Sequence, residues 1–152
     1  MLTKACIFHD TDSSVHDRRI FEIVEEAYGR RARVVIFAGS EERAQNLDKC
    51  LWILRQDSFI PHKILGNCEE AMDVPVAIIL HEWRPFHDGI LVADGHCSIE
   101  FAFGFSIIHE FVYRTSPDIQ EKCRNRFREY RERGIPVEYL KTGVWKGSMP
   151  KQ

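Results

Sequence analysis

The chain has 152 residues, of which 44% are hydrophobic and 29% are charged, so we expect one globular domain with a buried core. Its formal net charge of −2 argues against a protein that binds nucleic acid over most of its surface, because such proteins are basic. Any site for anions must therefore come from a local group of basic residues. The five cysteines form no C-x-x-C pair, and we expect free thiols, no signal peptide and a cytoplasmic protein.

The first half of the chain alternates predicted strands and helices. Residues 4–9 and 33–39 are short apolar runs, as is typical of strands that are covered on both faces. A helix with an apolar face follows each of them. The first helix is expected to be capped by Ser14 and to end at Gly29, and the second to be capped by Ser40. Short connections between such elements favour right-handed crossovers and a parallel sheet.

The second half adds further strands and one strong helix. We expect strands over residues 76–80, 89–93 and 105–113. A helix is expected over residues 117–133, with Ser116 as its cap and Gly134 as its end. The sequence therefore predicts one α/β domain over residues 1–152, with a Rossmann-like, mostly parallel sheet flanked by helices and a frayed tail over residues 146–152.

Nucleotide-binding motifs were sought because many proteins of this fold class bind nucleotides. The first predicted strand leads into "HDTDSSVHD", which contains no glycine, so neither G-x-G-x-x-G nor a P-loop is present. After the second strand, Glu41 and Glu42 place negative charge where a helix N-terminus would otherwise hold phosphate. No G-x-S-x-G motif occurs either. We expect no nucleotide, no cofactor and no catalytic site.

A metal site was considered at His81, His87, His96 and Cys97, which fall within a short segment. Their spacing matches no common zinc pattern, and H-E-x-x-H is absent. We therefore expect no metal, and interpret these residues as scattered loop side chains.

The final predicted helix, "SPDIQEKCRNRFREYRERG", combines an aromatic face with a basic row. Ile119, Cys123, Phe127 and Tyr130 share one face at spacings of four, four and three. Beside them lie Gln120, Arg124, Arg128 and Arg131 at the same spacings. This arrangement suits a short peptide that carries a carboxylate and a bulky apolar side chain. The alternative is a solvated amphipathic helix in which the arginines pair with glutamates.

A second cluster of bulky side chains occurs in "LWILRQDSFIPH", residues 51–62. Leu51 continues the apolar face of the second helix, but Trp52 lies about 100° away from it. Trp52 and Phe59 are either wedges in the core or anchors for a partner protein. We expect at least one of the two side chains to be partly exposed.

These two blocks resemble the chi subunit of bacterial DNA polymerase III. The family has a helix that ends in L-D-x-x-L-W and is followed by S-F-x-P-H. Its final helix carries an arginine, an aromatic residue and a basic residue, followed by Y-R-x-R-G, and this chain has the same pattern. The matching residues of the first block are Leu47, Asp48, Leu51, Trp52, Ser58, Phe59, Pro61 and His62. "HDGILVA" and "IPVEYLK" are also similar. The resemblance covers almost the whole chain.

The resemblance implies a non-catalytic accessory subunit of the replicase with a Rossmann-like fold. Family members bind the acidic, phenylalanine-ending C-terminal tail of single-stranded-DNA-binding protein (SSB). The resemblance places the SSB-tail site of this chain at Arg124, Phe127 and Arg128, with Gln120 beside them. It also implies a second surface, at Trp52 and Phe59 with Pro61 and His62, for the psi subunit of the clamp loader or for a helicase. No direct sequence-specific contact with nucleic acid is implied.

Two departures from the family pattern concern the tail site. The family commonly has Tyr where this chain has Phe127, and a basic residue where it has Gln120, so tail binding is expected to be weaker. Two other functions stay open on the sequence alone. One is a small enzyme that acts on a nucleotide or phosphoester. The other is an adaptor that acts only through the surface of Trp52 and Phe59.

Overall fold

The computed structural model describes residues 3–53, 59–66, 74–86, 88–113 and 117–141. Within them one sheet is formed by strands β1 (Ala5–Thr11), β2 (Val34–Phe37), β3 (His62–Leu65), β4 (Val76–Ile79), β5 (Ile90–Ala93), β6 (Ile107–Tyr113) and β7 (Val137–Leu140). The described helices are α1 (His16–Gly29), α2 (Glu41–Ile53), α3 (Ile99–Ala102) and α4 (Pro117–Glu132).

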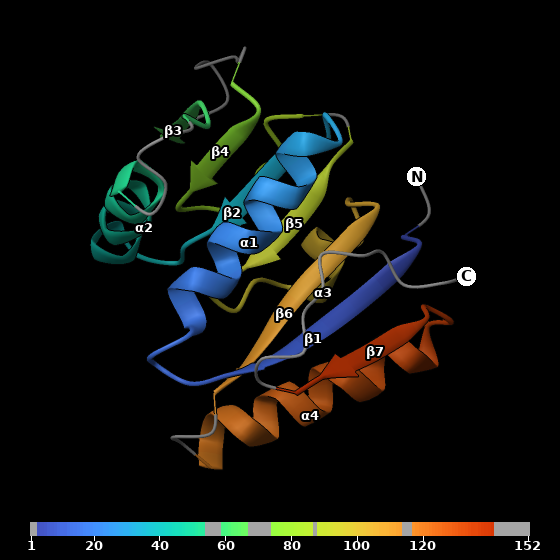
Figure 1. The fold of residues 1–152 in the computed structure, drawn as a ribbon. Helices are drawn as coiled ribbons and strands as arrows, with labels where there is room; N and C mark the ends of the chain where they lie inside the picture. The colour runs from blue at the N-terminus through green and yellow to red at the C-terminus, as the bar shows by residue number, and fades with distance from the viewer. Residues whose placement is uncertain (1–2, 54–58, 67–73, 87, 114–116, 142–152) are drawn as a thin grey trace.

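The strand order is β3-β4-β2-β5-β6-β1-β7, and all neighbouring strands run parallel. The predicted α/β class with a parallel sheet is thus confirmed. Every residue of β1, β2, β4 and β5 is buried, which is why β2, β4 and β5 are continuous apolar runs, whereas β1 ends in the buried polar residues His9, Asp10 and Thr11. Figure 1 shows α1 crossing in front of the sheet and α4 lying behind β7.

Alternate residues of each strand contribute to two separate cores. Val34 and Ile36 of β2 pack with buried side chains of α1 and α2. Val35 and Phe37 of the same strand pack with α3 and with Tyr130 of α4. This alternation follows from the two-residue period of a strand. As a result, α2 and α4 cover opposite faces of the sheet.

The ends of the helices confirm some predictions and correct others. Ser40 caps α2, since its Oγ accepts the N–H of Arg43 at 3.1 Å. Gly134 closes α4 with a φ of 84°, as expected. The predicted cap at Ser14 is wrong, because α1 begins at His16 and the Asp12 carboxylate accepts the N–H groups of Ser14 and Val15 instead. The expected cap at Ser116 and the tail over residues 146–152 lie outside the described residues.

The first helix ends at Gly29, as predicted, but the chain reverses two residues later. Arg31 has a φ of 62°, in the left-handed region where a side chain is disfavoured. Its N–H donates to Tyr28 O, and the N–H of Ala32 donates to Ala27 O. The left-handed residue that closes α1 is thus an arginine rather than a glycine.

Two neutral histidines are buried between the sheet and α1. Arg19 Nη1 donates to His9 Nδ1 at 3.0 Å, so His9 carries its proton on Nε2 and donates to His109 Nδ1 at 2.8 Å. Burial lowers the pKa of His109 to about 3. Burial also lowers the pKa of His9, and the neighbouring His109 and Arg19 lower it further. Both rings are therefore uncharged in the folded protein at neutral pH.

The buried histidines should make the protein acid-sensitive. Their pKa values are lower in the folded than in the unfolded chain, so unfolding takes up protons below the ordinary pKa of histidine and stability falls as the pH falls. From about pH 7 to about pH 5, each histidine should lower the free energy of unfolding by about 2 kcal/mol. Urea unfolding at several pH values measures this. A His9→Gln/His109→Gln variant should show a flatter pH dependence, and an unchanged slope would contradict the assignment.

Candidate functional site

Helix α4 presents the two faces that its sequence predicts. Cys123 and Tyr130 are buried against the sheet, and Phe127 is half-buried at the edge of this contact. Arg124, Arg128 and Arg131 are exposed along one side of the helix, and Gln120 is half-buried at the start of the row. The helix therefore places an aromatic edge directly beside a line of positive charge.

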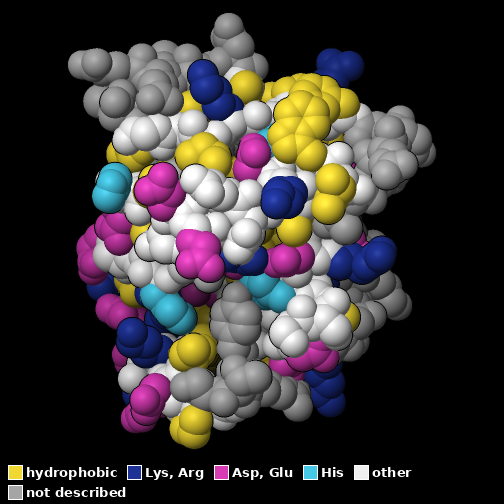
Figure 2. Space-filling view, turned by 90° about the vertical axis from the view of Figure 1, so that its left-hand side faces the viewer, with side chains coloured by type: hydrophobic (Ala, Val, Ile, Leu, Met, Phe, Trp, Pro, Cys, Tyr) yellow, Lys and Arg dark blue, Asp and Glu magenta, His cyan; other side chains and the backbone are white. Residues whose placement is uncertain are grey.

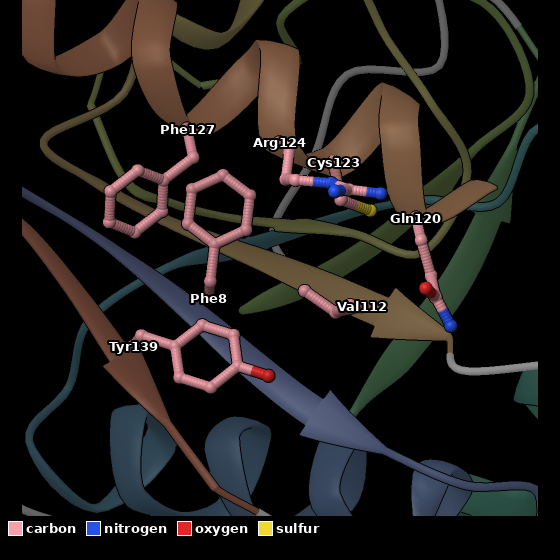
Figure 3. A pocket seen from close by; sticks show the side chains of 7 residues that line it. All are labelled: Phe8, Val112, Gln120, Cys123, Arg124, Phe127 and Tyr139. Carbon is pink, nitrogen blue, oxygen red and sulfur yellow. The ribbon is translucent and has the colours of Figure 1, made fainter. Parts of the chain in front are cut away.

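An apolar hollow of about 590 Å³ lies between α4 and the sheet. Four side chains of α4 line it, together with one from each of three strands: Gln120, Cys123, Arg124 and Phe127, then Phe8 of β1, Val112 of β6 and Tyr139 of β7. Figure 3 shows these side chains converging from the helix and from the strands.

The walls of the apolar hollow are held by contacts within the protein. The rings of Phe8 and Phe127 lie with their centroids 5.2 Å apart. Tyr139 donates its hydroxyl to Asp10 Oδ2 at 2.7 Å, which fixes its ring on the strand side of the hollow (Figure 3). The hollow is therefore a preformed space with three aromatic rings in its walls, suited to one bulky apolar side chain.

A second, basic hollow of about 510 Å³ adjoins the first. It is lined by Arg124, Phe127, Arg128, Arg131 and Glu132, so it shares Arg124 and Phe127 with the apolar hollow. Over the described part of the chain, neither Arg124 nor Arg131 makes an ion pair, and Arg128 donates only to Asn125 Oδ1 at 3.5 Å. These guanidinium groups are thus available to an anionic ligand.

One basic residue of α4 has a different role from its neighbours. Arg126 points inward and forms an ion pair with Glu110 of β6, where the two side chains are 12% and 2% exposed. Tyr130 donates its hydroxyl to the same carboxylate at 2.6 Å, and Arg126 also donates to Cys97 O. Burial alone would lower the pKa of Arg126, but its ion pair with Glu110 raises it. Arg126 therefore holds α4 in place and takes no part in the exposed row.

The surface predicted around Trp52 is exposed. Trp52 is 53% and Phe59 is 56% exposed, and their ring centroids lie 4.9 Å apart. Ile53 is exposed beside them. Figure 2, which looks onto the face that carries α2, shows hydrophobic side chains gathered near one end of that face. The expectation that at least one of the two rings is exposed is confirmed.

The other two residues predicted for this surface lie deeper. Pro61 is half-buried, and His62 is buried. The His62 ring contacts Trp52 edge-on, with centroids 5.1 Å apart, and its Nδ1 donates to Ile60 O at 2.7 Å. His62 thus supports the Trp52 ring from below. It is part of the structure beneath the surface and does not extend the exposed patch.

Sequence reasoning missed the strand residues of the apolar hollow, Phe8, Val112 and Tyr139.

In the described ranges, no group of three or more His, Cys, Asp or Glu side chains is arranged to hold a metal ion. Nor does any described helix have the length and apolar character needed to cross a membrane.

Comparison with known proteins identifies the family. Residues 4–138 match the family model of the DNA polymerase III chi subunit, HolC. The chain is 30% identical over 132 residues to the DNA polymerase III subunit chi of Pseudomonas aeruginosa, covering 87% of this chain and 90% of that protein. It is 29% identical over 144 residues to the subunit of the same name from Escherichia coli K12, covering 90% and 94%. The chain belongs to the DNA polymerase III chi subunit family.

The anchoring of α4 by Glu110 can be tested by substitution. Glu110→Gln would leave Arg126 charged and buried without its counterion, and should lower the free energy of unfolding by about 3–5 kcal/mol. Glu26→Gln is the matched control, since Glu26 pairs with Arg30 on the exposed side of α1 and should cost only about 0.3–0.5 kcal/mol. Urea unfolding of both variants measures the difference. Equal losses would show that the buried pair does not anchor the helix.

Proposed function

We propose that this chain is a non-catalytic accessory subunit of the bacterial DNA polymerase III holoenzyme, acting in the cytoplasm, and that α4 binds the acidic, phenylalanine-ending tail of SSB. The observation that carries the proposal is the junction of two hollows, one apolar and one basic, that share Arg124 and Phe127. A peptide that ends in an aromatic side chain and a carboxylate, preceded by acidic residues, matches this junction in both shape and charge.

The junction also gives the direction of the bound peptide. The terminal phenylalanine ring would enter the apolar hollow, between Phe127 and Tyr139. Its carboxylate would then lie near Arg124, which lines both hollows. The acidic residues that precede it would follow Arg128 and Arg131 along the helix. Binding in this direction uses the three exposed guanidinium groups that line the basic hollow.

The two departures from the family pattern act at this site. Gln120 lines the apolar hollow, so a neutral amide stands where the family commonly has a cation. Phe127 packs against Phe8 and has no hydroxyl group to offer the peptide. Affinity therefore depends on Arg124, Arg128 and Arg131 more than in a relative with the full basic row.

A non-catalytic role is supported by the residues at the carboxyl ends of β1 and β5, where α/β enzymes bind their ligands. There, His16 Nε2 bonds Asp94 Oδ1 at 2.7 Å, and Arg43 bonds the other oxygen of Asp94 at 2.7 Å. The side chains of His16 and Asp94 are almost completely buried. These side chains bond to one another, and those of His16 and Asp94 are shielded from solvent.

The second proposed surface consists of Trp52 and Phe59, with Ile53 beside them. We propose that it binds the psi subunit of the clamp loader or a helicase. Paired, half-exposed aromatic rings are typical anchors of a protein interface. Because α2 and α4 cover opposite faces of the sheet, both surfaces can be occupied at once. The protein would then connect SSB to a second component of the replication machinery.

Removal of one guanidinium group tests the tail site. Arg124→Ala and Arg128→Ala should each weaken binding of a labelled SSB tail peptide by about 1.5–3 kcal/mol, because each loses a charge-assisted hydrogen bond. Fluorescence anisotropy at low and moderate salt measures the affinity, with a peptide that lacks its terminal phenylalanine as a second probe. Arg18→Ala, an exposed arginine of α1, is the matched control. Unchanged affinity in both α4 variants would rule out this site.

The surface at Trp52 is tested separately. Trp52→Ala should abolish capture of purified psi subunit or helicase and leave tail-peptide affinity unchanged, since the ring is half exposed and lies on the other face of the sheet. Circular dichroism verifies that the variant is folded. Retention of both partners by the variant would contradict the assignment of this surface.

A further inference from the structure

The segment that closes α1 is unusually basic. Arg30, Arg31 and Arg33 fall within four residues, in a protein whose net charge is −2. This segment belongs neither to the hollows of α4 nor to the surface at Trp52. It is a local group of basic residues of the kind that an anion-binding site in an acidic protein requires.

A hollow of about 450 Å³ lies at this segment. It is lined by Tyr28, Gly29, Arg31 and Arg33 from the end of α1 and the start of β2, and by Val74 and Pro75 ahead of β4. The Tyr28 side chain is 39% exposed. An open aromatic ring and two guanidinium groups therefore share the same concave surface.

The two arginines that line the hollow differ from Arg30 in their contacts with the described carboxylates. Arg30, outside the hollow, pairs with Glu26 through two hydrogen bonds of 2.5 and 3.1 Å. In the parts of the chain that the structure describes, Arg31 and Arg33 have no ion pair. The Arg33 guanidinium lies over the ring of Phe86, 4.9 Å from its centroid, which holds the group in position. Among the described residues, no carboxylate pairs with either of these two positive charges.

The backbone at Arg31 gives independent evidence that its side chain is used. Its φ of 62° is strained for any residue with a Cβ, and glycine at this position would relieve the strain. Strained residues of this kind occur preferentially at binding sites. A basic residue also stabilises the carboxyl end of a helix through the helix dipole. The helix dipole, however, explains neither the left-handed backbone at Arg31 nor the exposed ring of Tyr28.

We infer that this hollow is a contact site for single-stranded DNA. Stacking of a base on an aromatic ring, with phosphates held by nearby arginines, is how sequence-independent binding of single strands is built. Tyr28 supplies the ring, and Arg31 and Arg33 supply the charges. The small number of cations makes the contact weak and dependent on salt. The hollow lies at the carboxyl end of α1 and the amino ends of β2 and β4, and it shares no lining residue with the two hollows of α4, so the contact is separate from the proposed tail site.

The test is fluorescence anisotropy of a labelled oligothymidylate of about 15 nucleotides, titrated with the full-length protein at low salt. We expect a dissociation constant between about 1 and 100 µM that weakens as salt is added. Arg31→Gly and Arg33→Gln should each weaken binding about tenfold. Tyr28→Leu should also weaken it, whereas Tyr28→Phe keeps the ring and should bind like the unmodified protein.

Controls separate this inference from the proposed function. Arg31→Gly removes the backbone strain, so a loss of DNA binding in a protein whose Tm is equal or higher cannot be due to misfolding. Arg31→Gly should bind the SSB tail peptide normally, and Arg124→Ala should bind the oligonucleotide normally. Three results would overturn the inference: no oligonucleotide binding at low salt, unchanged binding in Arg31→Gly and Arg33→Gln, or loss of binding only in Arg124→Ala.

Discussion

The position of α4 depends on one buried ion pair. Glu110 of β6 is almost fully covered, and a carboxylate in such a place requires a counterion and further donors. Arg126 and Tyr130 supply both, from two positions one helical turn apart. This contact fixes the rotation of the helix about its own axis. Once Arg126 and Tyr130 face the sheet, Phe127 must lie at the rim of the contact, and Arg124, Arg128 and Arg131 must face solvent.

A single constraint in the core thus determines the surface chemistry of α4. The apolar hollow exists because the amino-terminal half of the helix stands over Phe8, Val112 and Tyr139. The basic hollow exists because the next residues round the helix are arginines that form no ion pair with the described residues. Phe127 separates the two. A peptide that fills both hollows must therefore place acidic residues on one side of the Phe127 ring and an aromatic residue on the other.

The sequence predicted the parts of the fold that carry strong local patterns. The fully buried strands β1, β2, β4 and β5 and the long amphipathic helices were predicted, as was the exposure of at least one of the two rings, Trp52 and Phe59. The edge strands β3 and β7 were not predicted from their residues, because "HKIL" and "VEYL" are only half covered and lack a clear apolar run. The inward position of Arg126 was not predicted, although its spacing of four from Tyr130 places it next to the buried face of the helix. The apolar hollow could not be predicted, because it depends on which strands become neighbours.

That strand order gives the hollow a particular relation to the synthesis of the chain. Phe8 of β1 and Tyr139 of β7 are paired neighbours in the sheet, although Phe8 is synthesised long before Tyr139. The wall that they form is complete only when β7 has been added beside β1. A nascent chain whose β7 is still inside the ribosome therefore lacks this wall, even if its other strands have already folded. Premature termination before residue 137 removes the same wall, so the hollow is formed only in chains that have been translated through β7.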